Sequence, residues 1–200
     1  MIAPHGGHLT NRYVDSNEVD RLKETARSLV QVILSAKQIS DAHMISQGGF
    51  SPLEGFMGAA DYKEVIHNMH TTNGLLWPLP VTLAVTNEIA DGLKTGETIG
   101  LSDPNGTTIG TLDLEEIYSY DKQVEAIEVY GTTDQSHPGV SNIYHQGDAL
   151  LGGKINLFGF PDTDKDISPY YLSPKQTRSL IEERGWDTIV GFQTRNPVHR

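Results

Sequence analysis

The sequence predicts an α+β protein that is mainly β in its middle: a small β-barrel domain, then the first helix and strand of a Rossmann-like α/β domain. Short strand-like runs separated by turns fill residues 75–120, which is typical of a small barrel. A polar, acidic stretch bracketed by prolines at 160–169 has the composition of a linker. A helix, a strand and a polar loop then follow up to residue 200. We therefore expect residues 1–168 to form one domain with its linker and residues 169–200 to begin a second.

The first third of the chain predicts helices around one short strand. An acidic capping signal at Asp15, with Glu18 three residues later, opens a helix that runs to about residue 29. A β-branched run at 30–34 predicts a strand, and helical patterns cover 35–46 and 59–69.

Residues 48–57 break every periodic pattern. Gly48 and Gly49 end the preceding helix, and Ser51-Pro52 forces an extended turn. The apolar residues among them have no strand to belong to. We interpret the segment as a loop that fills the domain core with its aromatic side chains, in preference to a substrate-binding role.

Strands and turns alternate through the middle of the chain. The strand-like runs cover residues 77–85, 97–101, 107–114 and 149–158. Asn73-Gly74 stands between apolar runs and is a strong hairpin signal. A helical pattern at 121–130 places Val124 and Ile127 on its inward face.

Composition excludes several classes of protein. A net charge of −11 argues against a nucleic-acid partner, because binding to a phosphate backbone depends on lysine and arginine. No apolar run approaches the ~20 residues that span a bilayer, so we expect no membrane partner. The chain has no cysteine, which excludes disulfides and thiolate metal sites and favours a cytoplasmic location.

Positive charge gathers at the end of the chain. Residues 169–200 carry five basic and three acidic side chains, a net charge of +2, so the preceding 168 residues hold −13. A small positive patch on an acidic body suits a compact anionic ligand.

Histidine pairs could suggest a metal site. His5 with His8, and His67 with His70, are each three residues apart, but neither pair has a third ligand near it. We expect His43, which stands between Ala42 and Met44 in a helical pattern, to be a packed side chain. The sequence therefore predicts no metal held by protein ligands.

Polar groups crowd the last eight positions of the chain. They follow a strand expected at 186–192 and comprise Gln193, Thr194, Arg195, Asn196, Pro197, His199 and Arg200. Open α/β sheets bind ligands at the carboxyl ends of their strands. Pro197 suits the first turn of a helix and Asn196 its N-cap. The amides of that turn, together with two arginines, predict an anion-binding site.

Three segments resemble the ATP sulfurylase (sulfate adenylyltransferase) family. They are GGFSPLEGFM at 48–57, WPLP at 77–80 and QTRNPVHR at 193–200, the last matching a QTRNPxHR motif. The resemblance covers nearly the whole chain, and it implies a PUA-like barrel followed by a nucleotidyltransferase domain. In the family the last segment continues to a second histidine, forming H-x-x-H. This chain stops before it, so we expect the 200 residues alone to be inactive.

The resemblance also implies a reaction and its partners. The family joins sulfate to the α-phosphorus of ATP by direct attack, giving adenylyl sulfate and pyrophosphate. Mg²⁺ enters with ATP, held mainly by its phosphates. Enzymes of this type are usually homo-oligomers when full length.

The roles of the site residues follow from the resemblance joined to side-chain chemistry. Gln193 and Arg195 hold sulfate, because a planar guanidinium grips two oxygens and an amide adds a neutral donor. Thr194 and Asn196 donate to the α-phosphate and the loop, and His199 donates to phosphate oxygens. The expected catalytic residues are Thr194, Arg195, Asn196 and His199, and the expected ATP-phosphate ligands are Gln193, Thr194, Asn196 and His199.

Two functions of other classes stay open. One is a different H-x-x-H-type nucleotidyltransferase that uses another nucleophile. The pair Gln193 and Arg195 weighs against it, because these side chains suit a tetrahedral oxyanion. The other is a non-catalytic PUA-like binding module.

Overall fold

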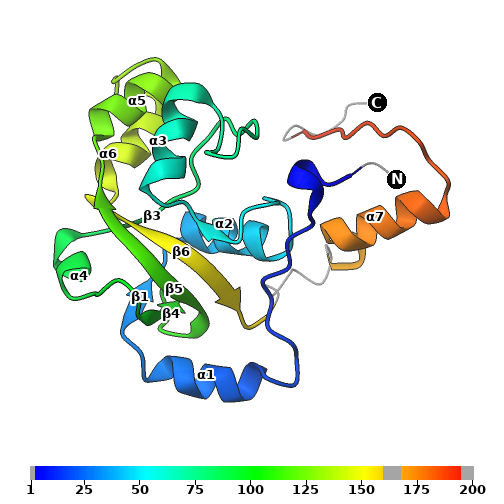
Figure 1. The fold of residues 1–200 in the computed structure, drawn as a ribbon, viewed down its shortest axis with the longest axis horizontal. Coiled ribbons are helices and arrows are strands. Elements are labelled where there is room, and N and C mark those ends of the chain that lie inside the picture. The colour runs from blue at the N-terminus through cyan, green and yellow to red at the C-terminus, as the bar shows by residue number, and fades with distance from the viewer. Residues whose placement is uncertain (1–2, 160–167, 195–200) are drawn as a thin grey trace.

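The computed structural model describes residues 3–159 and 168–194. In this part of the chain, six strands form one mixed sheet with helices around it, and a last helix stands to one side (Figure 1). The strands are β1 (Gln31–Ile33), β2 (Gly55–Phe56), β3 (Leu83–Val85), β4 (Thr98–Ser102), β5 (Thr108–Ser119) and β6 (Ala149–Leu157). The helices are η1 (His5–Gly7), α1 (Val19–Arg27), α2 (Ala36–Ser46), α3 (Ala59–Asn68), α4 (Asn87–Asp91), α5 (Lys122–Tyr130), α6 (Pro138–His145), η2 (Ser168–Tyr170) and α7 (Pro174–Glu183).

The sheet is built around β6. Its order is β1-β4-β5-β6-β2, with β3 also paired to β6, and every pairing is antiparallel except that of β1 with β4. β5 and β6 pair from Gly110↔Leu157 to Ser119↔Ala149, with one irregularity between Leu114 and Glu116. This long ladder carries much of the buried core, including Leu112, Leu114, Leu151, Ile155 and Leu157.

The other edge of β6 collects short segments from distant parts of the chain. β3 pairs with its first residues and β2 with Gly153 and Lys154. Near its end, the amide of Leu157 donates to the carbonyl of Arg12, and the Arg12 guanidinium donates to the carbonyl of Ile155 at 2.8 Å. One strand therefore holds the amino-terminal arm and both short strands.

Two glycines allow this crowding. Gly153 has φ +152°, and a Cβ there would lie 2.0 Å from the carbonyl oxygen of Asp113. A Cβ on Gly152 would lie 2.8 Å from Gly58 Cα, just before α3. Without side chains at these positions, β5 and the start of α3 can both approach β6 closely.

Most elements expected in the first third of the chain are confirmed. α2 begins where its pattern predicts, because the side chains of Ser35 and Gln38 cap each other's backbone amides. α1 begins at Val19, with Glu18 in the N-cap position and no side-chain capping bond, so the Asp15 capping signal is wrong in detail. The predicted strand at 77–85 shortens to β3, because Pro78 and Pro80 cannot donate to a ladder.

The loop at 48–57 fills the core as expected. Phe56 and Met57 are buried, and Phe50 and Leu53 pack against the same cluster. The ring of Phe50 meets that of Trp77 edge-on, with centroids 6.1 Å apart. The only part of the loop assigned to the sheet is the two-residue strand β2, beside β6.

The inward face of α5 is predicted only in part: Val124 packs against the Tyr62, Ile66 and Leu150 cluster as expected, but Ile127 does not face inward. Ile127 is 50% exposed, whereas Glu125 and Ala126 are buried. α5 packs between α3 and α6, and the hydroxyl of Tyr62 on α3 donates to Glu125 Oε2 at 2.7 Å. Burial raises the pKa of the Glu125 carboxyl above its ordinary value of 4.5, although the Tyr62 hydrogen bond acts the other way. Tertiary contact has overridden the apolar pattern.

We expect Gly153→Ala to lower the free energy of unfolding by about 2 kcal/mol or more, because a Cβ meets a carbonyl oxygen at a strained φ. Gly92→Ala is the control, since its Cβ would make only an ordinary 3.4 Å contact. Denaturant unfolding of both variants measures the difference. Equal stability of the two variants would contradict this account of β6.

Glu125→Gln should raise the free energy of unfolding at pH 7. A carboxyl whose folded pKa lies above its unfolded value stabilises the fold only at low pH and loses that contribution as pH rises. The neutral amide avoids this loss, so its advantage should vanish below pH 4.5. Thermal unfolding between pH 4 and pH 8 tests the trend. Glu128→Gln on the exposed side of α5 should show no comparable rise.

Candidate active site

The predicted site residues lie at the end of the described chain. Gln193 and Thr194 are both exposed. Arg195, Asn196 and His199 lie outside the described residues, as do Pro197, Arg200 and most of the expected linker, 160–167. The described part of the chain that leads to these residues consists of α7 and the segment 184–194, which we call the tail.

Local residues set the start and the end of α7. Ser173 Oγ accepts from the amide of Gln176 at 3.3 Å, and Gln176 Oε1 accepts from the amide of Ser173 at 2.9 Å. Pro174 occupies the first turn. Gly185 stops the helix with φ +64°.

A fixed turn follows α7 and sends the tail back over the body (Figure 1). The amide of Trp186 donates to the carbonyl of Ile181 at 3.2 Å. The guanidinium of Arg184 lies 4.8 Å from the centroid of the Trp186 ring, a cation–π contact.

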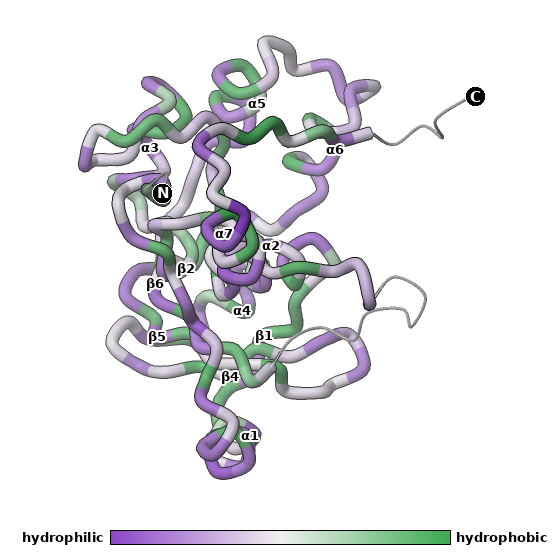
Figure 2. The backbone as a smooth tube through the Cα atoms, turned by 90° about the vertical axis from the view of Figure 1, so that its right-hand side faces the viewer, coloured by the Kyte–Doolittle hydropathy of each residue, from purple (hydrophilic) through white to green (hydrophobic). Residues whose placement is uncertain are grey.

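The strand expected at 186–192 is not formed. Among the described residues no strand pairs with this segment, and Val190 and Phe192 are 92% and 84% exposed. Figure 2 shows this apolar stretch of the tail, between α7 and the carboxyl terminus, in green. A strand of an open α/β sheet needs at least one neighbouring strand and helices that cover its faces, and the described chain supplies no neighbouring strand for this segment.

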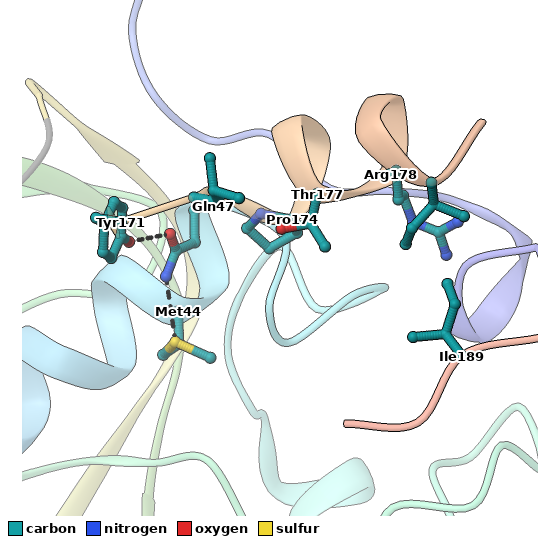
Figure 3. Close-up of a pocket in the computed structure, with 9 residues that line it drawn as sticks. Met44, Gln47, Tyr171, Pro174, Thr177, Arg178 and Ile189 are labelled. Carbon is teal, nitrogen blue, oxygen red and sulfur yellow. Dashed lines mark hydrogen bonds between the residues drawn. The ribbon is translucent and has the colours of Figure 1, made fainter. Parts of the chain in front are cut away.

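α7 joins the body at the end of α2. The hydroxyl of Tyr171 donates to Gln47 Oε1, and Gln47 Nε2 donates to the sulfur of Met44 at 3.2 Å (Figure 3). These residues border a pocket of about 480 Å³ between α2, α7 and Ile189 of the tail. Its walls are mainly apolar, with Arg178 at one side. The pocket therefore lies where α7 packs on the body, and it does not suit sulfate.

Two of the described histidines, His43 and His5, contact neighbouring protein groups. His43 Nδ1 and the hydroxyl of Tyr13 are hydrogen-bonded at 2.9 Å, and burial lowers the pKa of His43, which confirms its packed role. His5 Nε2 lies 3.0 Å from the carbonyl of Leu76. Over residues 3–159 and 168–194, no three His, Cys, Asp or Glu side chains gather as metal ligands would.

Membrane insertion finds no support in the helices. Within the same described ranges, none has both the length and the apolar character needed to cross a bilayer.

Sequence reasoning missed two features. The contact of Gln47 with Tyr171 joins residues 124 positions apart, and no local pattern signals it. Buried Glu125 was hidden because a charged residue in an amphipathic helix is expected to face solvent.

Comparison with known proteins identifies two regions. Residues 2–159 match the model of a PUA-like domain, and residues 168–200 match that of ATP-sulfurylase. Proteins curated as sulfate adenylyltransferase are similar along the chain: those of Acaryochloris marina, Synechococcus sp. and Symbiobacterium thermophilum are 47%, 48% and 46% identical to it. The alignments cover all of this chain but only 51%, 50% and 50% of those relatives, so the chain spans about half their length.

A solved structure is also similar. It is described as hexameric APS kinase from Thiobacillus denitrificans, with a TM-score of 0.75 and 28% identity, over all of this chain and 35% of that one.

The contact of Tyr171 with Gln47 predicts how firmly α7 is held. Tyr171→Phe should speed hydrogen exchange of the α7 amides several-fold, because a lost hydrogen bond costs about 1 kcal/mol. The matched control is Tyr170→Phe, whose side chain is 84% exposed. Exchange in β5 and β6 should be unchanged in both. If the two variants exchange alike, the contact does not hold α7.

Proposed function

The chain belongs to the PUA-like domain family through residues 2–159, and from this and the ATP-sulfurylase match that follows we propose that it serves sulfate adenylyl transfer. The observation that carries the proposal is the sequence identity of 44–48% to proteins curated as sulfate adenylyltransferase. The alignments extend along the whole chain and so include the predicted anion-binding loop. This chain spans about half the length of those relatives, so the activity is proposed for a protein of their full length.

We place the domain boundary at residue 168. The PUA-like match ends at 159 and the ATP-sulfurylase match begins at 168, which supports residues 1–168 as the first domain with its linker. Residues 169–200 then open the nucleotidyltransferase domain. The exposed side chains of Val190 and Phe192 support this, because neighbouring strands and helices of such a domain would cover them.

The reaction requires two anions to meet. A sulfate oxygen attacks the α-phosphorus of ATP, a new P–O bond forms, and the bond to the bridging oxygen breaks with its electron pair leaving on pyrophosphate. Sulfate is a weak nucleophile, so charge repulsion and misalignment make up most of the barrier. Positioning and electrostatic stabilisation are therefore the main catalytic contributions.

Gln193 and Arg195 hold sulfate in this proposal. The guanidinium of Arg195 can bind two sulfate oxygens and neutralise charge, and Gln193 adds a neutral N–H donor. Both lie directly after the apolar tail segment, where an α/β sheet presents its ligand.

Thr194, Asn196 and His199 serve the nucleotide. A hydroxyl and an amide donate to α-phosphate oxygens, and an imidazole donates to the oxygens that gain charge as pyrophosphate departs. Asn196 would also cap the helix start that Pro197 opens, so that backbone amides cradle a phosphate.

Magnesium would enter with ATP. The phosphates of ATP bind Mg²⁺ directly, and the ion lowers the repulsion that sulfate meets. We further propose a cytoplasmic protein that binds no nucleic acid, supported by the lack of cysteine and the net charge of −11. Assembly into a homo-oligomer is supported by the similar structure described as hexameric.

Arg195→Ala in the full-length protein should lower kcat/KM for sulfate about 100-fold or more, because a charge-assisted bidentate contact is lost. The measurement is pyrophosphate release from Mg-ATP with and without sulfate. Arg27→Ala is the matched control: its exposed guanidinium pairs with Glu24 on α1, away from the tail, so turnover should change little.

Pyrophosphate release that does not depend on sulfate would show that the protein is a nucleotidyltransferase with another nucleophile. ATP binding without any turnover by the full-length protein would favour a binding module. Sulfate-dependent turnover by residues 1–200 alone would contradict the proposal that the site needs the longer protein.

A further inference from the structure

Glu125 is the one charged side chain among the buried residues that the structure describes, with 5% of its surface exposed. It belongs to α5, far in sequence from the tail. A buried carboxylate is costly unless other groups neutralise it and satisfy its oxygens.

The hydrogen bonds around Glu125 are incomplete for a charged carboxylate. Oε2 accepts one hydrogen bond, from the Tyr62 hydroxyl at 2.7 Å. The two nearby ammonium groups pair elsewhere: Lys37 with Asp41 at 2.9 Å, and Lys122 with Asp148 at 2.7 Å. Both still favour the charged form of Glu125 through space, but the described contacts include no salt bridge to it.

A pocket of about 190 Å³ opens beside this carboxyl, between α2, α5 and α6. Its polar wall contains Glu125, Asp41, Asn142 and Gln146, whose oxygens can accept hydrogen bonds, and also Lys37, whose ammonium group pairs with Asp41 at 2.9 Å. Its apolar wall includes Phe50 and Val81. The pocket is thus small, acidic at one end and apolar at the other.

We propose that this pocket binds a small organic cation, with a primary ammonium group on the Glu125 carboxylate and a short apolar body against the apolar wall. An ammonium N–H would supply the second charge-assisted hydrogen bond that the buried carboxylate lacks, and its charge would offset the burial cost. Lys37 neutralises Asp41 in this wall, which leaves the Glu125 carboxylate as a net negative charge there and disfavours an anion. The inference stands independently of the sulfate site.

n-Butylammonium tests the proposal on the full chain, with neutral n-butanol as the isosteric control. Titration followed by the side-chain amide signals of Asn142 and Gln146 should show saturable shifts with n-butylammonium. Butanol should bind the unaltered chain about tenfold or more weakly than n-butylammonium does. The Glu125→Gln variant should bind n-butylammonium more weakly than the unaltered chain by a similar factor. Glu128→Gln, the same change on the exposed side of α5, should bind as the unaltered chain does.

Thermal unfolding at saturating n-butylammonium gives a second reading, because a ligand that binds the folded state raises its stability. The rise should occur in the unaltered chain and the Glu128→Gln variant only. Equal binding of butanol and n-butylammonium would overturn the proposal, as would unchanged binding by Glu125→Gln or shifts that never saturate.

Discussion

The pairing of β6 on both edges is the constraint on which the rest of the structure depends. One edge carries β5 along its whole length, and the other takes β3, β2 and the arm at Arg12 in succession. Gly152 and Gly153 make this possible, because a Cβ at either position would meet backbone atoms within 3 Å. Arg12 and Ile155, which are 143 positions apart in the chain, are thereby held side by side.

That constraint also fixes what the site is attached to. The arm held by β6 brings Tyr13 against His43 on α2, and the end of α2 receives Tyr171 just before α7. A continuous set of packed and hydrogen-bonded groups thus runs from the sheet to α7, the helix that precedes the predicted site residues. The PUA-like body supplies a packed base, while the tail beyond Gly185 keeps its apolar side chains exposed.

Local signals predicted much of the fold. The boundaries of α2, α5 and α7 follow from the caps at Ser35, Asp121 and Ser173, which act within three residues. Contacts between distant segments could not be predicted in this way. Val124 faces inward as expected, but Ile127 is exposed, and α5 instead buries Ala126 and Glu125, whose carboxylate accepts a hydrogen bond from Tyr62. The strand at 186–192 has the right residues and no partner in the described chain. For the candidate site, the sequence supplies the order of the side chains from Gln193 onward, but it does not supply their arrangement in space.

The most direct test of the central claim is a crystal structure of the full-length protein with adenylyl sulfate bound. The account predicts residues 186–192 as a paired strand, with the sulfate group within hydrogen-bonding distance of Gln193 and Arg195 and the α-phosphate near Thr194 and Asn196. Adenylyl sulfate bound away from these residues, or no strand before them, would contradict the account.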